Sequence, residues 1–223
     1  MVRDIYAGYR NACLMVFRRA GDQVTYLATA VLVHGDGYLL TAAHPLGEHD
    51  GLVVAPWDPQ EDFSPARLRT VAPEPVERVA TDAEHDLALL RVRRDLEISV
   101  PDHILGNPEE VHVGTEVATL GYAFGFERIH NLIVQHAVVS ARMAARNGTH
   151  LLLFDTMIHI GSRGGPLVNV QDGRIIGIIG DRFDPAETSW ARGQEAALPN
   201  TNLSYAIGID HGKDLLAEAG VSA

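Results

Sequence analysis

The chain has 223 residues, of which 46% are hydrophobic and 21% are charged, and it contains 21 glycines and 11 prolines. This length suits one large domain or two small ones, and the many turn-forming residues favour a β-rich globular protein. Twenty-nine acidic against 18 basic residues give a formal net charge of -11. No basic block could follow a phosphate backbone, so we expect no nucleic-acid partner.

The compartment is predicted from the N-terminal residues and from the single cysteine. The first residues, "MVRDIYAGYRNACLMVF", show no basic segment followed by a long apolar one, and no apolar run approaches roughly 18 residues. Cys13 is the only cysteine, so an intrachain disulfide is impossible, which fits a reducing compartment. We therefore expect no membrane association and a cytoplasmic protein, or a periplasmic one if the chain is truncated.

The chain is predicted to begin and end with short helices and to consist mainly of strands. A helix is expected over Asp4 to Asn11, followed by the runs "ACLMVFRR", "VTYLATAVLVH" and "YLLTAAH", which Gly-Asp pairs separate as in hairpins. Ala55 to Glu77, rich in proline and acid, is predicted to be a long surface connection. The second helix is expected over Gly212 to Ala219. Further strands are predicted at Val76 to Ala80, Leu87 to Val92, Glu116 to Tyr122, Leu132 to Ser140, Leu151 to Asp155, Pro166 to Val170, Arg174 to Ile179 and Ser204 to Ile209.

The number and spacing of these strands are typical of a β-sandwich or of β-barrels. If the chain forms two barrels, the crossover is expected between Arg93 and Asn107, where strand character is lost.

Three segments carry candidate chemistry: "LLTAAHPL" with His44, "EHDLALLRV" with Asp86, and "GSRGGPLVN" with Arg163. Each alone has an ordinary structural explanation, since a histidine at a strand end, an aspartate before a strand and a Gly-Gly-Pro turn are all common. Their combination in this order is much more specific.

In this order the segments resemble the trypsin-like (chymotrypsin-fold) serine proteases, especially the bacterial Deg/HtrA-like branch. The stretches "GDGYLLTAAH", "HDLALLRV", "VGTEVATLGYAFGF", "FDTMIHIGSRGGPLVNVQDGRIIGI" and "YAIGI" extend the resemblance over most of Ala28 to Ile209. It implies an all-β fold of two six-stranded antiparallel β-barrels with short terminal helices. The expected organisation is a single protease domain over 1–223, with an N-terminal barrel in 1–100, a C-terminal barrel in 101–210 and a helix in 211–223.

The resemblance also implies the roles of a serine endopeptidase. His44 matches the general base and Asp86 the acid that orients it, whereas His85 should point away as a bystander. The backbone N–H groups of Gly161 and Arg163 would form the oxyanion hole.

The expected ligand is a peptide or an unfolded protein segment, and an oligomer is possible. Met157 would form the floor of the primary specificity pocket, and Ile179, Gly180 and Asp181 a wall, so an aliphatic or aromatic substrate side chain is expected. We expect no cofactor and no metal, because the stretch "HPLGEHD" after the third strand matches no strong zinc signature.

Arg163 occupies the position where the family carries its nucleophilic serine. A guanidinium is protonated near neutrality and has no lone pair with which to attack, so we predict an inactive protease domain. Ser162 is displaced by one residue and should face elsewhere. Arg163 is expected to pair with Asp86 or Asp181. The alternative function is a non-catalytic peptide-binding module, and Arg163 could be natural or introduced in the laboratory.

Overall fold

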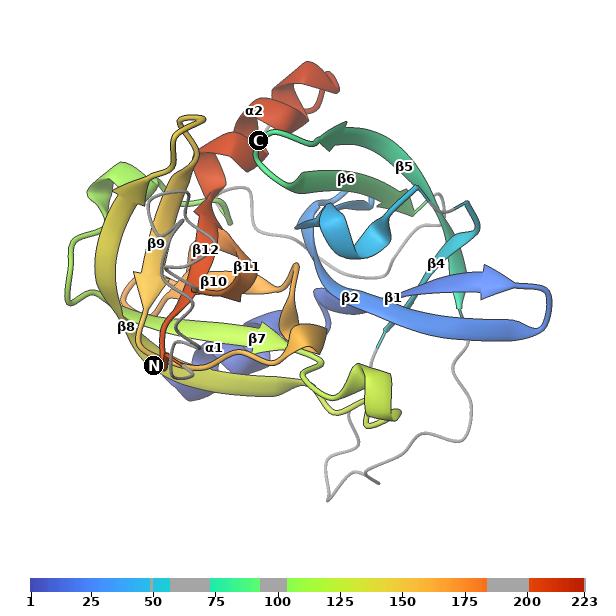
Figure 1. The fold of residues 1–223 in the computed structure, drawn as a ribbon, viewed down its shortest axis with the longest axis horizontal. Helices are drawn as coiled ribbons and strands as arrows, with labels where there is room; N and C mark the ends of the chain where they lie inside the picture. Colours follow the sequence, from blue (N-terminus) through green and yellow to red (C-terminus); the bar gives the residue numbers. More distant parts are fainter. Residues whose placement is uncertain (49, 57–72, 93–103, 184–200, 223) are drawn as a thin grey trace, which may run out of the picture.

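In a computed structural model, residues 1–48, 50–56, 73–92, 104–183 and 201–222 are described. Their strands form two closed antiparallel barrels of six strands each, which lie side by side in Figure 1. The predicted fold class is therefore confirmed. The predicted crossover around residues 93–103 lies outside the described residues, as does His49 of the "HPLGEHD" stretch.

The first barrel has the strand order β1-β2-β3-β6-β5-β4, and β1 pairs with β4 to close it. Turns that contain a glycine with a left-handed φ, such as Gly21 and Gly37, separate some of its strands. The strands are β1 (Cys13–Ala20), β2 (Gln23–His34), β3 (Tyr38–Ala42), β4 (Leu52–Pro56), β5 (Glu74–Asp82) and β6 (Leu87–Val92).

The second barrel has the order β10-β11-β12-β9-β8-β7, and β10 pairs with β7 to close it. Its strands are β7 (Glu116–Gly121), β8 (Ile133–Ala144), β9 (His150–Phe154), β10 (Pro166–Asn169), β11 (Ile175–Arg182) and β12 (Ser204–Gly208). A 3₁₀ turn at Ile160–Ser162 precedes β10 and packs against β2 of the first barrel. The loop that carries Arg163 therefore lies where the two barrels meet.

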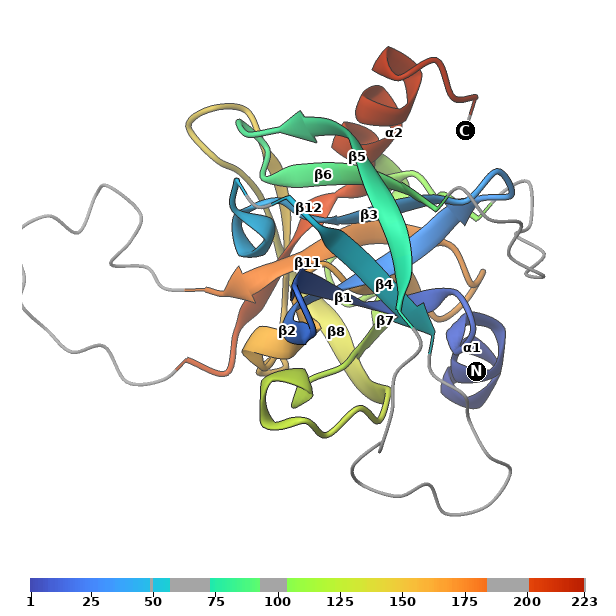
Figure 2. The same cartoon turned by 90° about the vertical axis from the view of Figure 1, so that its right-hand side faces the viewer.

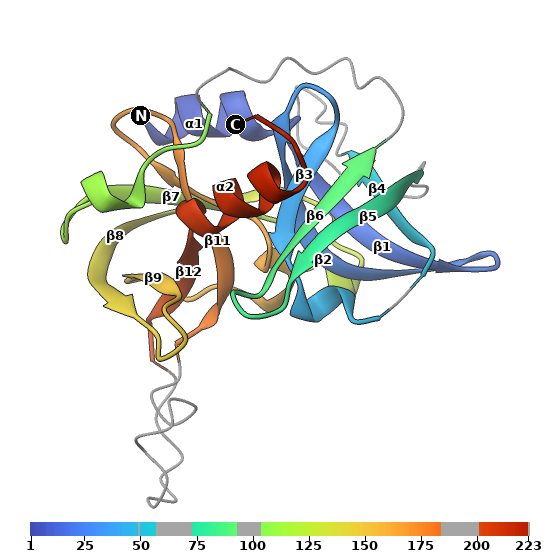
Figure 3. The same cartoon turned by 90° about the horizontal axis from the view of Figure 1, so that it is seen from above.

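Two short helices pack on the barrels, on opposite sides of the pair in Figures 1 and 2. Helix α1 (Val2–Tyr9) packs against β7 and β8. Helix α2 (Ile209–Glu218) contacts β5 and β6 of one barrel and β11 and β12 of the other, as the view in Figure 3 shows. Helix α2 covers the outer face of β6, so both faces of this strand are buried. Its sequence, "LALLRV", is therefore almost continuously apolar and does not alternate between apolar and polar residues.

One hydrophobic cluster continues from the first barrel into the second. It joins Cys13 and Leu40 to Leu120 and Tyr122, and the Tyr122 hydroxyl donates to the Cys13 carbonyl at 2.9 Å. Cys13 is fully buried, and burial raises the pKa of its thiol. The barrels are therefore held together by shared apolar packing.

The structure corrects the predicted connection from Ala55 to Glu77 at both of its ends. Ala55 and Pro56 belong to β4, and β5 already begins at Glu74, while residues 57–72 lie outside the described residues. Proline and acidic residues are usual loop signals, but Pro75 lies on β5, whose residues alternate between half-buried and exposed. Within the described residues, no helix has the length and apolar character needed to cross a membrane.

Candidate active site

His44 and Asp86 lie next to one another at one end of the first barrel. His44 begins a 3₁₀ turn two residues after β3 ends at Ala42, and Asp86 lies in the turn between β5 and β6 with a left-handed φ of 57°. The His44 ring Nδ1 lies 2.7 Å from Asp86 Oδ2, and the His44 backbone N–H donates to Asp86 Oδ1 at 2.7 Å. One carboxylate thus fixes both the ring and the backbone of the histidine, which leaves the ring's Nε2 as the free nitrogen.

His85, the residue before Asp86, is turned toward a different partner. Its Nδ1 lies 2.6 Å from Asp82 Oδ2, and its ring stacks on His211 with 4.0 Å between centroids. It is therefore engaged in a separate group of side chains, on the side of α2.

The loop from Ile160 to Gly165 is anchored to β2 through backbone atoms. The Gly161 carbonyl accepts hydrogen bonds from the Tyr26 hydroxyl at 2.6 Å and from the Thr29 hydroxyl at 2.8 Å. The Thr29 N–H donates to the Arg163 carbonyl at 2.9 Å. Tyr26 and Thr29 are both buried, so their hydroxyls are directed at this loop without competition from water.

Gly164 is required by this geometry. Its φ is +82°, and a Cβ added there would lie 2.1 Å from the Thr41 hydroxyl oxygen and 2.2 Å from the Thr29 carbonyl oxygen. Its N–H donates to the Ile179 carbonyl at 2.8 Å. A residue with a side chain would therefore be both strained and in collision with the first barrel.

Arg163 follows the 3₁₀ turn, and its side chain is directed at β11. Its Nη2 forms an ion pair and hydrogen bond with Asp181 Oδ2, and Asp181 Oδ1 also accepts the Arg182 N–H at 2.7 Å. The Arg163 side chain is only 24% exposed, and its Nε is buried without a hydrogen-bond partner among the described residues. Of the two carboxylates considered from the sequence, the structure pairs Arg163 with Asp181, while Asp86 holds His44.

Ser162 is buried, with 4% of its surface exposed. Its Cα, Cβ and Oγ pack within 2.9 Å of the place where a Cβ of Gly121 would be, so the side chain faces the end of β7. This hydroxyl is therefore directed into the protein.

Of the two expected oxyanion donors, Gly161 lies within the 3₁₀ turn and Arg163 follows it. The Ser162 N–H donates to the His159 carbonyl at 2.8 Å, and the Arg163 N–H donates to the Ile160 carbonyl at 3.3 Å. The second bond is long and closes the turn. In this conformation the Arg163 amide is directed at the Ile160 carbonyl and not at the solvent side of the loop.

The residues expected to line a specificity pocket lie on the second barrel. Ile179 is fully buried in β11, and an added Cβ at Gly180 would lie 2.2 Å from the Tyr205 ring. The Met157 carbonyl accepts a hydrogen bond from Gln135 at 3.4 Å. Asp181 is the one charged member of this set and is neutralised by Arg163.

A cleft of about 260 Å³ opens beside Asp86. Its walls come from both barrels, with Asp86 on one side and Arg182, Phe183 and Tyr205 on the other. The cleft thus combines an aromatic wall with charged groups.

Comparison with known proteins adds the family. A family model described as "Trypsin-like peptidase domain" matches residues 28–178, which include His44, Asp86 and Arg163. The chain belongs to the trypsin-like peptidase family. The resemblance predicted from the three motifs is thereby confirmed.

Curated relatives are bacterial proteases of this family. A probable periplasmic serine endoprotease DegP-like of Halomonas elongata is 31% identical over 164 residues, covering 70% of this chain and 30% of that protein. The DegP-like protein of Hahella chejuensis is 31% identical over 166 residues, covering 73% and 31%. The magnetosome formation protease MamE of Paramagnetospirillum magneticum is 30% identical over 164 residues, covering 71% and 20%. The matched part is thus a third or less of each relative's length.

Solved structures support the fold. The serine endoprotease from Yersinia pestis aligns with a TM-score of 0.70 at 21% identity, covering 98% of this chain and 66% of that one. The HtrA-type protease AlgW with a tripeptide aligns with a TM-score of 0.71 at 22% identity, covering 98% and 63%. These structures share the two-barrel fold of this chain.

The cytoplasmic location predicted from the sequence is contradicted by these relatives. The DegP-like proteins are described as periplasmic, which points away from the cytoplasm. The prediction rested on a lone cysteine and an apparent lack of a leader, and a protein in an oxidising compartment does not need a disulfide.

The sequence did not single out Tyr26 and Thr29, which hold the loop from Ile160 to Gly165. Both lie within the apolar run of β2, and both are buried. A buried hydroxyl in a strand requires a hydrogen-bond partner, and this was the available signal. The partner itself, a carbonyl more than a hundred residues away, becomes visible only in the fold.

Proposed function

We propose that this domain has the architecture of a serine endopeptidase but does not hydrolyse peptide bonds as it stands. The observation that carries the proposal is the combination of an ordered His44–Asp86 pair with Arg163 at the nucleophile position. The pair is the base and the orienting acid of a triad, because Asp86 binds Nδ1 and leaves Nε2 free to accept a proton. The hydroxyl that would give up this proton is absent.

Arginine cannot take over the missing role. Covalent catalysis needs an atom with a lone pair, and the guanidinium has five N–H donors and no acceptor. Ser162 offers no replacement, since its hydroxyl is buried against Gly121.

Arg163 also obstructs the substrate side in this proposal. Its side chain extends from the nucleophile loop to Asp181 on β11, the strand expected to form a wall of the specificity pocket. The ion pair compensates both charges, which favours this arrangement over a solvent-exposed arginine. A scissile peptide would have to displace the pair before reaching His44.

The test is hydrolysis of unfolded casein by the wild-type domain, Arg163→Ser and Arg163→Ala. The wild type and Arg163→Ala should be inactive, because neither has a nucleophile, and Arg163→Ser should gain activity. Casein hydrolysis by the wild type or by purified Arg163→Ala would refute the proposal. If Arg163→Ser folds but stays inactive, the 3₁₀ turn that engages the Arg163 amide is the second defect to remove.

Peptide binding without cleavage is the second candidate function, and the cleft beside Asp86 favours it. Phe183 and Tyr205 supply aromatic surface, and Arg182 supplies a cation within the same walls. A fluorescent peptide library read by anisotropy should reveal saturable binding to the wild type. Phe183→Ala should weaken that binding by about 10-fold, since a lost aromatic contact of this kind is worth on the order of 1.4 kcal/mol, whereas Phe126→Ala, an exposed aromatic elsewhere, should not.

A further inference from the structure

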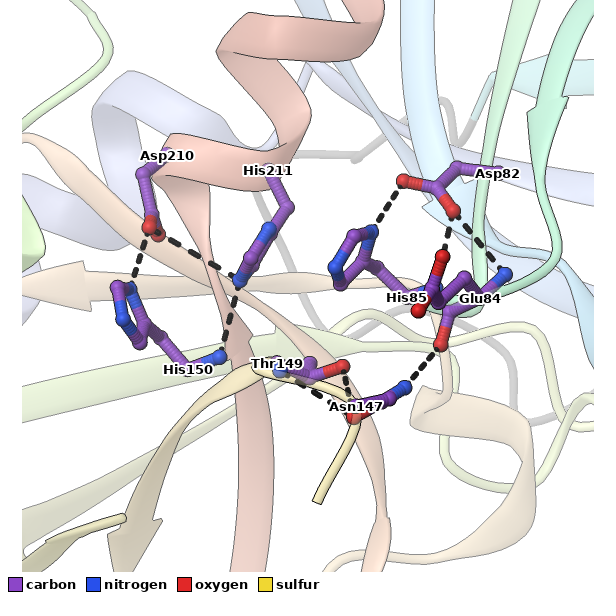
Figure 4. A network of polar contacts seen from close by, with 8 residues as sticks. All are labelled: Asp82, Glu84, His85, Asn147, Thr149, His150, Asp210 and His211. Atoms are coloured by element: carbon purple, nitrogen blue, oxygen red, sulfur yellow. Dashed lines mark hydrogen bonds and ion pairs between the residues drawn. The ribbon is translucent and has the colours of Figure 1, made fainter. Parts of the chain in front are cut away.

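A second group of ionisable side chains lies outside the candidate active site, where the hairpin between β8 and β9 meets the start of α2. Figure 4 shows its members: His150 at the beginning of β9, Asp210 and His211 in the first turn of α2, and the neighbouring pair Asp82 and His85. Neither the proposed triad nor the peptide cleft accounts for His150, Asp210 and His211.

The first observation is the convergence of three groups that can bind a metal. One ligand atom from each of His150, Asp210 and His211 lies within 4.8 Å of the other two. His150 Nδ1 is 2.6 Å from Asp210 Oδ2, and His211 Nε2 is 3.9 Å from the same oxygen. Two imidazoles and a carboxylate form a ligand set that zinc commonly takes from proteins.

The second observation is the protonation state of His211. Its Nε2 accepts a hydrogen bond from the His150 backbone N–H at 2.9 Å, so this nitrogen carries a lone pair and no proton. A metal needs an imidazole with an available lone pair directed into the site.

The third observation is the support around the three groups. His85 stacks on His211 at 4.0 Å with an interplanar angle of 16°, and Asp82 holds the His85 ring through Nδ1 at 2.6 Å. Asp210 Oδ1 is buried and has no hydrogen-bond partner among the described residues. An ordered imidazole and a carboxylate oxygen without a partner are features that a bound cation would use.

We propose that His150, Asp210 and His211 bind a structural zinc ion, with water as the fourth ligand. Binding at His150 Nδ1 moves the proton of this nitrogen, by exchange with solvent, to Nε2 of the same neutral ring, and it replaces the hydrogen bonds from His150 to Asp210 and from the His150 amide to His211. Tetrahedral ligands at about 2.0–2.2 Å from zinc lie roughly 3.4 Å from one another, so His150 and Asp210 must move apart and His211 must come closer to Asp210. His150 is 51% exposed and can rotate to do so.

The proposed zinc site would link two parts of the fold. His150 belongs to the second barrel, and α2 packs against strands of both barrels. A zinc ion would therefore cross-link the β8–β9 hairpin to the helix that bridges the two barrels. This inference does not depend on the proposed lack of protease activity.

The test is titration of the chelator-treated protein with Zn²⁺, followed by calorimetry and by thermal unfolding. We expect one zinc per chain and a rise of several degrees in Tm at excess zinc, because the ion binds the folded state preferentially. His150→Gln, Asp210→Asn and His211→Gln should each weaken binding by at least about 10-fold. His136→Gln, an exposed histidine paired with Glu116 at 3.8 Å, is the matched control and should bind as the wild type does.

Circular dichroism of each variant without metal separates loss of the site from loss of the fold. Among the variants, we expect His150→Gln to disturb the fold least, because His150 is exposed. The proposal is overturned if the wild type shows no saturable binding up to about 100 µM zinc. It is equally overturned if folded His150→Gln and Asp210→Asn bind zinc as tightly as the control.

Discussion

Asp86 accepts two hydrogen bonds from His44, one from the ring and one from the backbone amide, each at 2.7 Å. The carboxylate therefore fixes the position of the chain after β3 as well as the orientation of the imidazole. Asp86 adopts a left-handed φ of 57°, a conformation that Asp and Asn tolerate better than most residues. The relationship is built into the fold, because it joins the chain after β3 to the turn before β6.

Replacing Asp86 should reduce stability through this double contact. Asp86→Asn keeps the backbone conformation but offers one acceptor instead of two, so the free energy of unfolding should fall by about 1 kcal/mol. Asp86→Ala should cost more, because both contacts are lost and the left-handed conformation is less tolerated. Urea unfolding measures both.

The matched control for Asp86 is Asp36→Asn. Asp36 Oδ2 lies 3.8 Å from His34 Nδ1 and is mostly exposed, so the change should stay within about 0.5 kcal/mol. Equal losses in Asp36→Asn and Asp86→Asn would contradict a structural role for the double contact.

Arg163 and Asp181 should be energetically coupled. A double-mutant cycle compares the free energies of unfolding of the wild type, Arg163→Gln, Asp181→Asn and the double variant. We expect a coupling energy of about 0.5–2 kcal/mol, because the pair is partly shielded from water. The exposed pair His136 and Glu116, 3.8 Å apart, should give a value near zero. A coupling energy of zero between Arg163 and Asp181 would show that the arginine is not held at β11.

Gly164 should tolerate no side chain. Gly164→Ala introduces a Cβ into the Thr41 hydroxyl and the Thr29 carbonyl at a φ of +82°, so we expect a loss of more than about 3 kcal/mol or failure to fold. Gly148→Ala is the control for the conformation alone, since its φ is +88° and nothing lies within 4 Å of the added atom. It should cost about 1 kcal/mol. Similar melting temperatures for the two variants would exclude the close approach of the loop to the first barrel.

His130 should make stability dependent on pH. Burial, and to a smaller extent Arg128, lowers the pKa of His130 below its usual value, so the unfolded chain takes up a proton that the folded chain does not. Stability should therefore fall as the pH decreases through the ordinary histidine range near about 6.5. His130→Phe removes this contribution, and its Tm should decline less steeply with acid than that of the wild type. The exposed His112→Phe should leave the slope unchanged, and a His130→Phe profile parallel to the wild type would argue against this role.

The strands and their grouping into barrels were largely predictable from the sequence, because the short apolar runs are separated by turn residues. The prediction failed at β4 and at the start of β5, where proline and acid lie on strands. The predicted start of α2 at Gly212 was also too late, because the helix begins at Ile209, directly after β12, with Gly208 as its N-cap. In both cases tertiary packing outweighs the local signal.

The candidate site was predictable where residues follow fixed motifs and unpredictable where it depends on contacts between barrels. His44, Asp86 and Arg163 were found from their motifs. The choice of Asp181 over Asp86 as the partner of Arg163, and the support of Gly161 by Tyr26, depend on how β2 and β11 lie around the loop. Such long-range positions have no signature in sequence spacing.

Reaction with a fluorophosphonate probe tests the central claim most directly, because the probe labels a serine only when a neighbouring base activates it. We expect no labelling of the wild-type domain. In Arg163→Ser we expect labelling at residue 163, mapped by mass spectrometry and abolished by a further His44→Ala change. Labelling of the wild-type domain at Ser162 or at any other serine, lost in His44→Ala, would contradict the central claim.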